Sequence, residues 1–130
     1  MKWDVAILGG GLAGQLCARQ LTRQVPGLRI GVFERSTGTS FKVGEATVEI
    51  GASYLVRRQS LLRYLYDRHY PKNGLRYFFD NESNSAPLQT MSEIGPINFP
   101  FHAAFQIDRA RIEADLIEMN SEAGVEVRTG

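Results

Sequence analysis

The sequence predicts an α/β fold built on a βαβ unit with a parallel sheet, and three features of the first 35 residues predict it. Residues 5–8 form a short continuous apolar run, which is typical of a strand buried on both faces. Three glycines follow this run, and a helical pattern of leucines follows the glycines. A second apolar run ends at Glu34-Arg35. Two parallel strands joined by a helix form a right-handed crossover.

The helix of this unit is predicted by leucines near helical spacing. They are Leu12, Leu16 and Leu21. Pro26-Gly27 ends the helix, because proline and glycine terminate helical patterns. The second strand is expected over residues 28–33, and the small polar residues 36–40 are expected to form a loop.

The middle of the chain carries weaker patterns. One helix is expected from about residue 52 to residue 68, ended by Pro71. Residues 75–79 are aromatic and apolar, which makes them a strand candidate. Residues 81–87 are polar and rich in turn formers, as in a loop or hairpin connection, and residues 96–100 are irregular.

The last part of the chain predicts a strand, a helix and a further strand. Residues 104–107 are a short strand candidate, and Asp108 is a suitable N-cap for a helix over residues 109–122. Gly124 has the position of the glycine that follows a helix. Residues 125–127 alternate as the start of another strand.

Composition and charge argue against several classes of function. The net charge is +1, so no strong field attracts nucleic acid or an anionic membrane. The apolar runs are too short for a signal peptide or a membrane span, which gives the cytoplasm as the default location. The single cysteine, Cys17, favours a reducing compartment and is expected to be a small buried residue. His69 and His102 lack partners at ligand spacing, so no metal site is expected.

Residues 9–14 match the pattern G-x-G-x-x-G in the context that the pattern requires, with a strand before it, a helix after it and Glu34 twenty positions past Gly14. Gly9 allows a tight turn, Gly11 lets a pyrophosphate approach the backbone, and Gly14 lets the helix pack close to the strand. The helix N-terminus attracts the pyrophosphate, and Glu34 accepts hydrogen bonds from the adenosine ribose, which disfavours NADP. The pattern alone does not distinguish FAD from NAD.

Three segments together resemble one family. Residues 4–14 resemble the opening of flavoproteins of the aromatic hydroxylase superfamily. Residues 42–49, Lys-Val-Gly-Glu-Ala-Thr-Val-Glu, resemble the G-E-[AS]-T segment of the flavin-dependent halogenases, the tryptophan halogenase family. Residues 105–111 resemble the Q-[VI]-D-R segment shared by those halogenases and related monooxygenases. The order and spacing of the three segments also fit, and the resemblance spans essentially the whole chain.

The resemblance implies FAD as the cofactor and a GR2-type flavoprotein fold, a Rossmann-like FAD-binding βαβ unit that is incomplete in this chain. The residues implied for the pyrophosphate are Gly9, Gly11, Ala13 and Gly14. The resemblance implies that Glu34 binds the adenosine ribose and that the neighbouring Arg35 is also a cofactor-binding residue. The residues implied for a strap-like loop near the isoalloxazine are Gly44, Glu45, Ala46 and Thr47. Arg109 is implied to lie near the cofactor.

Lys72 is the implied catalytic residue. Residues 72–77, Lys-Asn-Gly-Leu-Arg-Tyr, are similar to the K-x-G-[IL]-x-[FY] context of a halogenase lysine. That lysine captures or orients hypohalous acid, and a compact ammonium group suits this task. The alternative is a surface lysine in an ordinary Pro-Lys-Asn-Gly turn.

The resemblance implies an oxidoreductase that uses FADH₂, O₂ and halide to halogenate an aromatic or other electron-rich substrate, with reduced flavin from a separate reductase. The family's W-x-W-x-I-P and G-D segments are not in the sequence. A doubly wound sheet also has about five or six strands. We therefore expect residues 1–130 to be the truncated N-terminal part of an FAD-binding domain, without a second domain and inactive alone. The alternatives are an FAD-dependent monooxygenase or reductase on the same scaffold and a noncatalytic FAD-binding fragment. Residues 44–47 argue against an NAD-dependent dehydrogenase.

Overall fold

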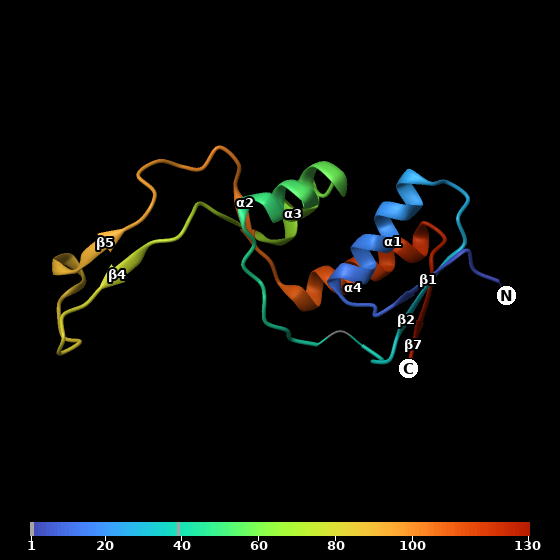
Figure 1. The fold of residues 1–130 in the computed structure, drawn as a ribbon, viewed down its shortest axis with the longest axis horizontal. Helices are drawn as coiled ribbons and strands as arrows, with labels where there is room; N and C mark the ends of the chain where they lie inside the picture. The colour runs from blue at the N-terminus through green and yellow to red at the C-terminus, as the bar shows by residue number, and fades with distance from the viewer. Residues whose placement is uncertain (1, 39) are drawn as a thin grey trace.

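The computed structural model describes residues 2–38 and 40–130, so Thr39, in the loop expected at 36–40, lies outside the described residues. Figure 1 shows an α/β body from which one long arm projects. Three strands of the body form a parallel sheet in the order β1-β2-β7. They are β1 (Val5–Leu8), β2 (Ile30–Glu34) and β7 (Glu126–Thr129). The predicted α/β fold with a parallel sheet is confirmed.

Two helices cover this sheet. Helix α1 (Leu12–Gln24) joins β1 to β2 as predicted, and α4 (Arg109–Glu122) leads into β7. The two helices pack against each other on the same side of the sheet (Figure 1). In β1, Val5 and Ile7 are half-buried, whereas Ala6 and Leu8 are exposed. The prediction that this strand is buried on both faces is wrong for this chain, because the helices lie on one face only.

The helix expected over residues 52–68 is divided into three pieces. They are α2 (Glu49–Ser53), the π-helical turn η1 (Tyr54–Arg58) and α3 (Leu62–Arg68). Ser60 has a left-handed backbone, with φ of 54°, and this breaks the helix. The buried side chain of Gln59 anchors the break, since its Nε2 donates to the carbonyl of Leu16 in α1 at 3.2 Å. The last helical piece ends at Arg68, before Pro71.

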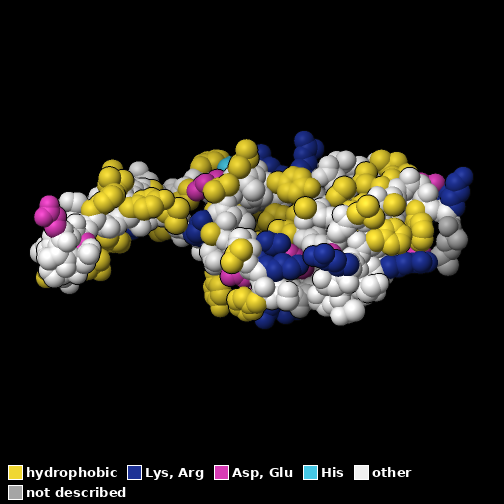
Figure 2. Space-filling model, turned by 60° about the horizontal axis from the view of Figure 1, so that its bottom comes forward, with side chains coloured by type: hydrophobic (Ala, Val, Ile, Leu, Met, Phe, Trp, Pro, Cys, Tyr) yellow, Lys and Arg dark blue, Asp and Glu magenta, His cyan; other side chains and the backbone are white. Residues whose placement is uncertain are grey.

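Two antiparallel strand pairs follow. Strand β3 (Tyr70–Lys72) pairs with β6 (Ala104–Gln106) at the body. Strand β4 (Tyr77–Phe79) pairs with β5 (Ser92–Ile94) in the arm, and the 3₁₀ turn η2 (Leu88–Thr90) lies between them. The strands expected within 75–79 and 104–107 and the hairpin connection at 81–87 are confirmed, whereas β3 and β5 were not predicted. Figure 2 shows hydrophobic side chains exposed along this arm.

The helix α4 has the predicted ends. The carboxylate of its N-cap, Asp108, accepts a hydrogen bond from the backbone of Arg111 at 2.9 Å, and Gly124 follows the helix with φ of 86°. Ile112 and Leu116 are fully buried in the core between α4, α1 and the divided helix. Cys17 is exposed rather than buried, because it lies on the side of α1 away from its buried neighbours. Among the described residues, no helix is long and apolar enough to cross a membrane.

Candidate functional site

The glycine loop (residues 9–14) has the geometry that its sequence predicts. Gly9 adopts φ of 108°, a conformation that residues with a side chain rarely adopt. An ideal Cβ atom on Gly14 would lie 1.9 Å from the carbonyl oxygen of Gly9. The start of α1 therefore touches the loop so closely that only glycine fits at position 14.

The N-terminus of α1 is open to a ligand. Its N-cap, Gly11, offers no side-chain cap, and the first turn carries no acidic residue. Ala13 is exposed in this turn. Backbone N–H groups at a helix N-terminus lack intrahelical partners and lie at the positive end of the helix dipole. This arrangement suits a diphosphate.

Glu34 lies at the carboxyl end of β2, beside the glycine loop. Its carboxylate accepts hydrogen bonds from the backbone N–H of Ser36 at 3.0 Å and of Gly10 at 2.7 Å. These donors lower the pKa of Glu34, which keeps it ionised at neutral pH. A carboxylate accepts more than two hydrogen bonds, so capacity remains for ribose hydroxyls. Arg35, beside it, is exposed.

Gly10 is a further position that the sequence motif does not single out. An ideal Cβ atom there would lie 2.7 Å from the Cβ of Glu34, so a side chain would push the loop away from β2. A cavity of about 200 Å³ opens beside these residues. Its lining includes Gly10, Glu34, Lys42, Glu113 and Thr129. The size of this cavity suits part of a dinucleotide.

The segment 44–47 lies along one edge of β6. The backbone N–H of Thr47 donates to the carbonyl of Phe105 at 2.9 Å, and the N–H of Phe105 donates to Thr47 Oγ1 at 2.7 Å. Ala46 forms a β-bridge with Gln106. The structure thus brings together two segments that resemble halogenase motifs, although about 60 residues separate them.

Arg109 fixes the segment 44–47 to the start of α4. Its backbone N–H donates to Glu45 Oε1 at 3.1 Å, and its Nη1 donates to the carbonyl of Val43 at 3.0 Å. Gly44 adopts φ of 88°, and an ideal Cβ there would lie 3.3 Å from Arg109 Nη1. The guanidinium therefore passes close to the backbone of Gly44.

Glu113 is a further charged residue of this site, which no motif in the sequence marks. Its buried carboxylate accepts from Arg109 through Nη2 at 2.5 Å and Nε at 3.0 Å, and it forms an ion pair with Lys42. Burial raises the pKa of Glu113, but the hydrogen bonds from Lys42 and Arg109 outweigh burial and lower it. The i,i+4 spacing of Arg109 and Glu113 is a sequence signal that could have found this pair.

Lys72 is the last residue of β3, where it pairs with Ala104. Its side chain is half-buried, and the described residues give its ammonium group no ion pair or hydrogen bond. Strand β6 lies between β3 and the segment 44–47, since Gln106 is opposite Tyr70 on one side and Ala46 on the other. The structure therefore places Lys72 across β6 from the strap-like segment, without direct contact to the glycine loop.

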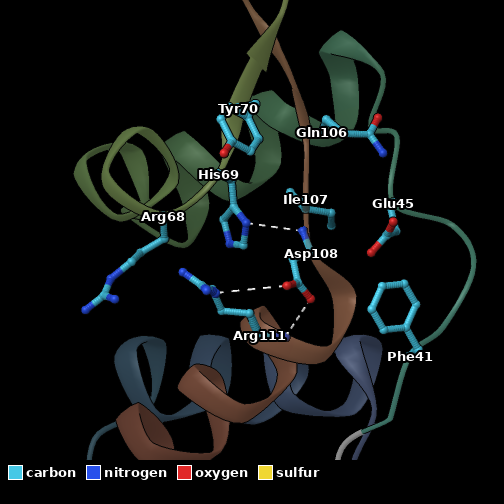
Figure 3. Close-up of a pocket in the computed structure, with 9 residues that line it drawn as sticks. All are labelled: Phe41, Glu45, Arg68, His69, Tyr70, Gln106, Ile107, Asp108 and Arg111. Atoms are coloured by element: carbon cyan, nitrogen blue, oxygen red, sulfur yellow. Dashed lines mark hydrogen bonds and ion pairs between the residues drawn. The ribbon is translucent and has the colours of Figure 1, made fainter.

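A second cavity, of about 330 Å³, lies next to the segment 41–45 (Figure 3). His69 is buried at its wall, and its Nδ1 accepts from the backbone N–H of Asp108 at 3.2 Å. Its Nε2 therefore carries the proton and donates to the Tyr64 hydroxyl at 3.2 Å, and Tyr64 donates to Asp115 at 2.8 Å. The described residues contain no group of His, Cys, Asp and Glu suited to a metal ion.

The neutral state of His69 gives the fold a dependence on pH. Burial lowers the pKa of His69 below its usual 6.5, so the unfolded chain binds the proton more readily. Stability is therefore lost as pH falls from about 6.5 toward the lower pKa of the folded state, and protonated Nδ1 can no longer accept from Asp108. Thermal unfolding followed between about pH 7 and pH 5 should show this loss. His69→Gln should flatten the profile, and His102→Gln, at an exposed position, should retain it. An unchanged profile in His69→Gln would contradict this assignment.

Comparisons with known proteins agree with this geometry. Residues 7–69, which include the glycine loop and Glu34, match the family described as NAD(P)-binding Rossmann-like domain. The flavin-dependent halogenase chlA of Dictyostelium discoideum is 33% identical over 126 residues. That match covers 90% of this chain and 21% of chlA, so the chain spans about a fifth of this relative's length.

Solved structures share the fold. The myxobacterial chondrochloren halogenase CndH, described as a variant of FAD-dependent halogenases, superimposes with a TM-score of 0.74 at 22% identity, covering 98% of this chain and 28% of CndH. The halogenase PltM in complex with phloroglucinol and FAD superimposes with a TM-score of 0.72 at 20% identity, covering 98% of this chain and 27% of PltM. At these identities the superpositions show the Rossmann-like fold.

Proposed function

We propose that residues 1–130 are the N-terminal part of the FAD-binding domain of a flavin-dependent halogenase. The observation that carries this proposal is the glycine loop at the open N-terminus of α1, with ionised Glu34 beside it. The 33% identity to a flavin-dependent halogenase supports FAD rather than NAD as the dinucleotide. The segment 44–47, which resembles the halogenase motif, lies close to this loop through Arg109 and Glu113.

The residues present suit the parts of FAD. The N–H groups at the start of α1 offer donors to the diphosphate, and Glu34 offers acceptors to the adenosine hydroxyls. The segment 44–47 runs along β6 as a strap that we assign to the isoalloxazine end. When bound, FAD supplies the redox chemistry with O₂, while the protein binds and orients it.

We assign the halogenation step to Lys72. Lys72 is half-buried, and its ammonium group has no hydrogen bond or ion pair among the described residues, so it is available to hydrogen-bond hypohalous acid. A small unselective oxidant needs such a donor to direct it toward one atom of an electron-rich, aromatic substrate. In this proposal the rest of the full-length protein provides the substrate site, and a separate reductase supplies reduced flavin.

Replacement of Glu34 tests the proposed cofactor site. Glu34→Gln removes the charge and one of the acceptor oxygens, so the dissociation constant for FAD should rise by about tenfold or more. Titration of FAD, followed by quenching of flavin fluorescence, measures this change. Glu118→Gln removes a carboxylate from the exposed side of α4 and should leave the affinity unchanged. Equal affinities for FAD in Glu34→Gln and the unmodified protein would contradict the assignment.

A further inference from the structure

Three charged side chains form a cluster at the glycine loop. The cluster, which we call the counter-ion cluster, consists of Lys42, Arg109 and Glu113. An ideal Cβ atom on Gly11 would lie 3.9 Å from both carboxylate oxygens of Glu113 and 3.9 Å from Lys42 Nζ. Glu113 and Lys42 therefore face the part of the loop that a diphosphate is expected to approach, and Arg109 joins them through its bond to Glu113.

The members of the cluster differ in exposure. The Glu113 side chain is 1% exposed, that of Arg109 is 19% exposed and that of Lys42 is 40% exposed. Glu113 Oε1 accepts from Arg109, and Oε2 accepts from Lys42, so one buried carboxylate holds two cations. Arg109 also donates to the carbonyl of Val43, whereas Lys42 has only Glu113 as a partner among the residues that the structure describes.

Stability alone is a poor reason for this arrangement. Removing ions from water costs several kcal/mol per ion, and apolar residues of similar volume often stabilise a protein as well as a buried ion pair does. The cluster also carries a net charge of +1, from two cations and one anion, beside the positive end of α1. Glu34 lines the same cavity as Lys42 and Glu113 and offsets part of this charge.

We propose that Glu113 is a positioning residue, which holds Lys42 and Arg109 in place as a preassembled pair of cations for the diphosphate of the cofactor. This inference rests on the proposed function. Because these side chains are already held in one conformation before the ligand binds, binding loses less side-chain conformational entropy. Lys42 is the more exposed of the two cations, and its Nζ lies 3.9 Å from the position of an ideal Cβ on Gly11, so it can meet a phosphate oxygen without leaving Glu113.

Glu113→Gln separates this role from simple electrostatics. The substitution removes a negative charge near an anionic ligand, so charge alone predicts tighter binding of FAD. Loss of the preassembled cations predicts weaker binding, and we expect the dissociation constant for FAD to rise about tenfold. A dissociation constant that is unchanged or lower would overturn the proposal. Circular dichroism and thermal unfolding establish that the variant is folded at the titration temperature.

Lys42→Met tests the same proposal. Lys42 is partly exposed, so its replacement should disturb the fold less than replacement of the buried Glu113. The dissociation constant should rise, and its dependence on salt should become flatter, because one cation no longer contacts the ligand. Arg63→Met removes an equal charge from an exposed position on α3 and should change neither quantity. An unaltered salt dependence in Lys42→Met would overturn the proposal. If the unmodified protein binds no FAD, the proposed function fails. If the unmodified protein and the variants bind FAD with equal affinity, the role of the counter-ion cluster fails and the proposed function stands.

Discussion

Gly14→Ala is expected to destabilise the protein by about 3 kcal/mol and to lower its affinity for FAD by at least about 100-fold. The new Cβ atom would lie 1.9 Å from the Gly9 carbonyl oxygen and 3.4 Å from the Ile7 side chain. A backbone carbonyl cannot rotate away as the end of a flexible side chain can. The start of α1 must therefore move away from the loop, and its N–H groups move with it. Urea denaturation measures the first effect, and FAD titration measures the second.

Gly51→Ala is the matched control for this substitution. Gly51 lies in α2, and an added Cβ there meets nothing within 4 Å. Alanine is a better helix former than glycine, so the free energy of unfolding should stay the same or rise by up to about 1 kcal/mol. FAD affinity should not change. If Gly14→Ala behaved like this control, the close contact between the glycine loop and α1 would be wrong.

Lys72→Ala in the full-length protein should reduce halogenation by at least about 100-fold while FAD binding stays intact. The substitution removes the ammonium group that we assign to orienting hypohalous acid, whereas Lys72 lies in the β3–β6 pair and not in the glycine loop. The halogenated product is measured by mass spectrometry, with reduced flavin supplied. FAD affinity is measured separately on the same sample.

Two further variants sharpen the test of Lys72. Lys72→Arg should also have low activity, because a planar guanidinium differs from a compact ammonium in the geometry of its donors. Lys2→Ala removes an exposed lysine near the N-terminus and should keep full activity. Unchanged halogenation in Lys72→Ala would contradict the role of this residue. Oxygenated product without halogenated product, in the unmodified protein, would favour a monooxygenase on the same scaffold.

Local signals in the sequence predict much of this fold. The first strand, the glycine loop and α1 follow from an apolar run, a motif and a leucine pattern. Asp108 and Gly124 mark the two ends of α4, because N-cap carboxylates and left-handed glycines act within one turn. These features depend on neighbouring residues, which is why the sequence reveals them.

Long-range contacts explain what the sequence did not reveal. The break at Ser60 depends on Gln59 bonding to Leu16, which is 43 positions away along the chain. A periodic pattern does not report such a contact, so one continuous helix was expected. The exposed face of β1 similarly depends on which side of the sheet the helices cover. The position of β7 beside β2 is a matter of topology that local patterns leave open.

The candidate site also contains some residues that local sequence patterns reveal and others that only long-range contacts reveal. The motif residues Gly9, Gly14 and Glu34 were found because their spacing is specific. Gly10 and Glu113 were missed because both depend on contacts between distant segments. Gly10 must be small because it lies against Glu34 of β2. Glu113 is buried because α4 packs beside the glycine loop. The segment 44–47 was found by resemblance, and its pairing with β6 came from the structure.

The central claim is that this chain holds FAD at the glycine loop, and titration of the folded protein with FAD, NAD⁺ and NADP⁺ tests it most directly. We expect FAD to bind with a dissociation constant in about the micromolar range or below, as for a specific cofactor site. NADP⁺ should not bind, because ionised Glu34 repels a 2′-phosphate. Binding of NAD⁺ or NADP⁺ without binding of FAD would contradict the account.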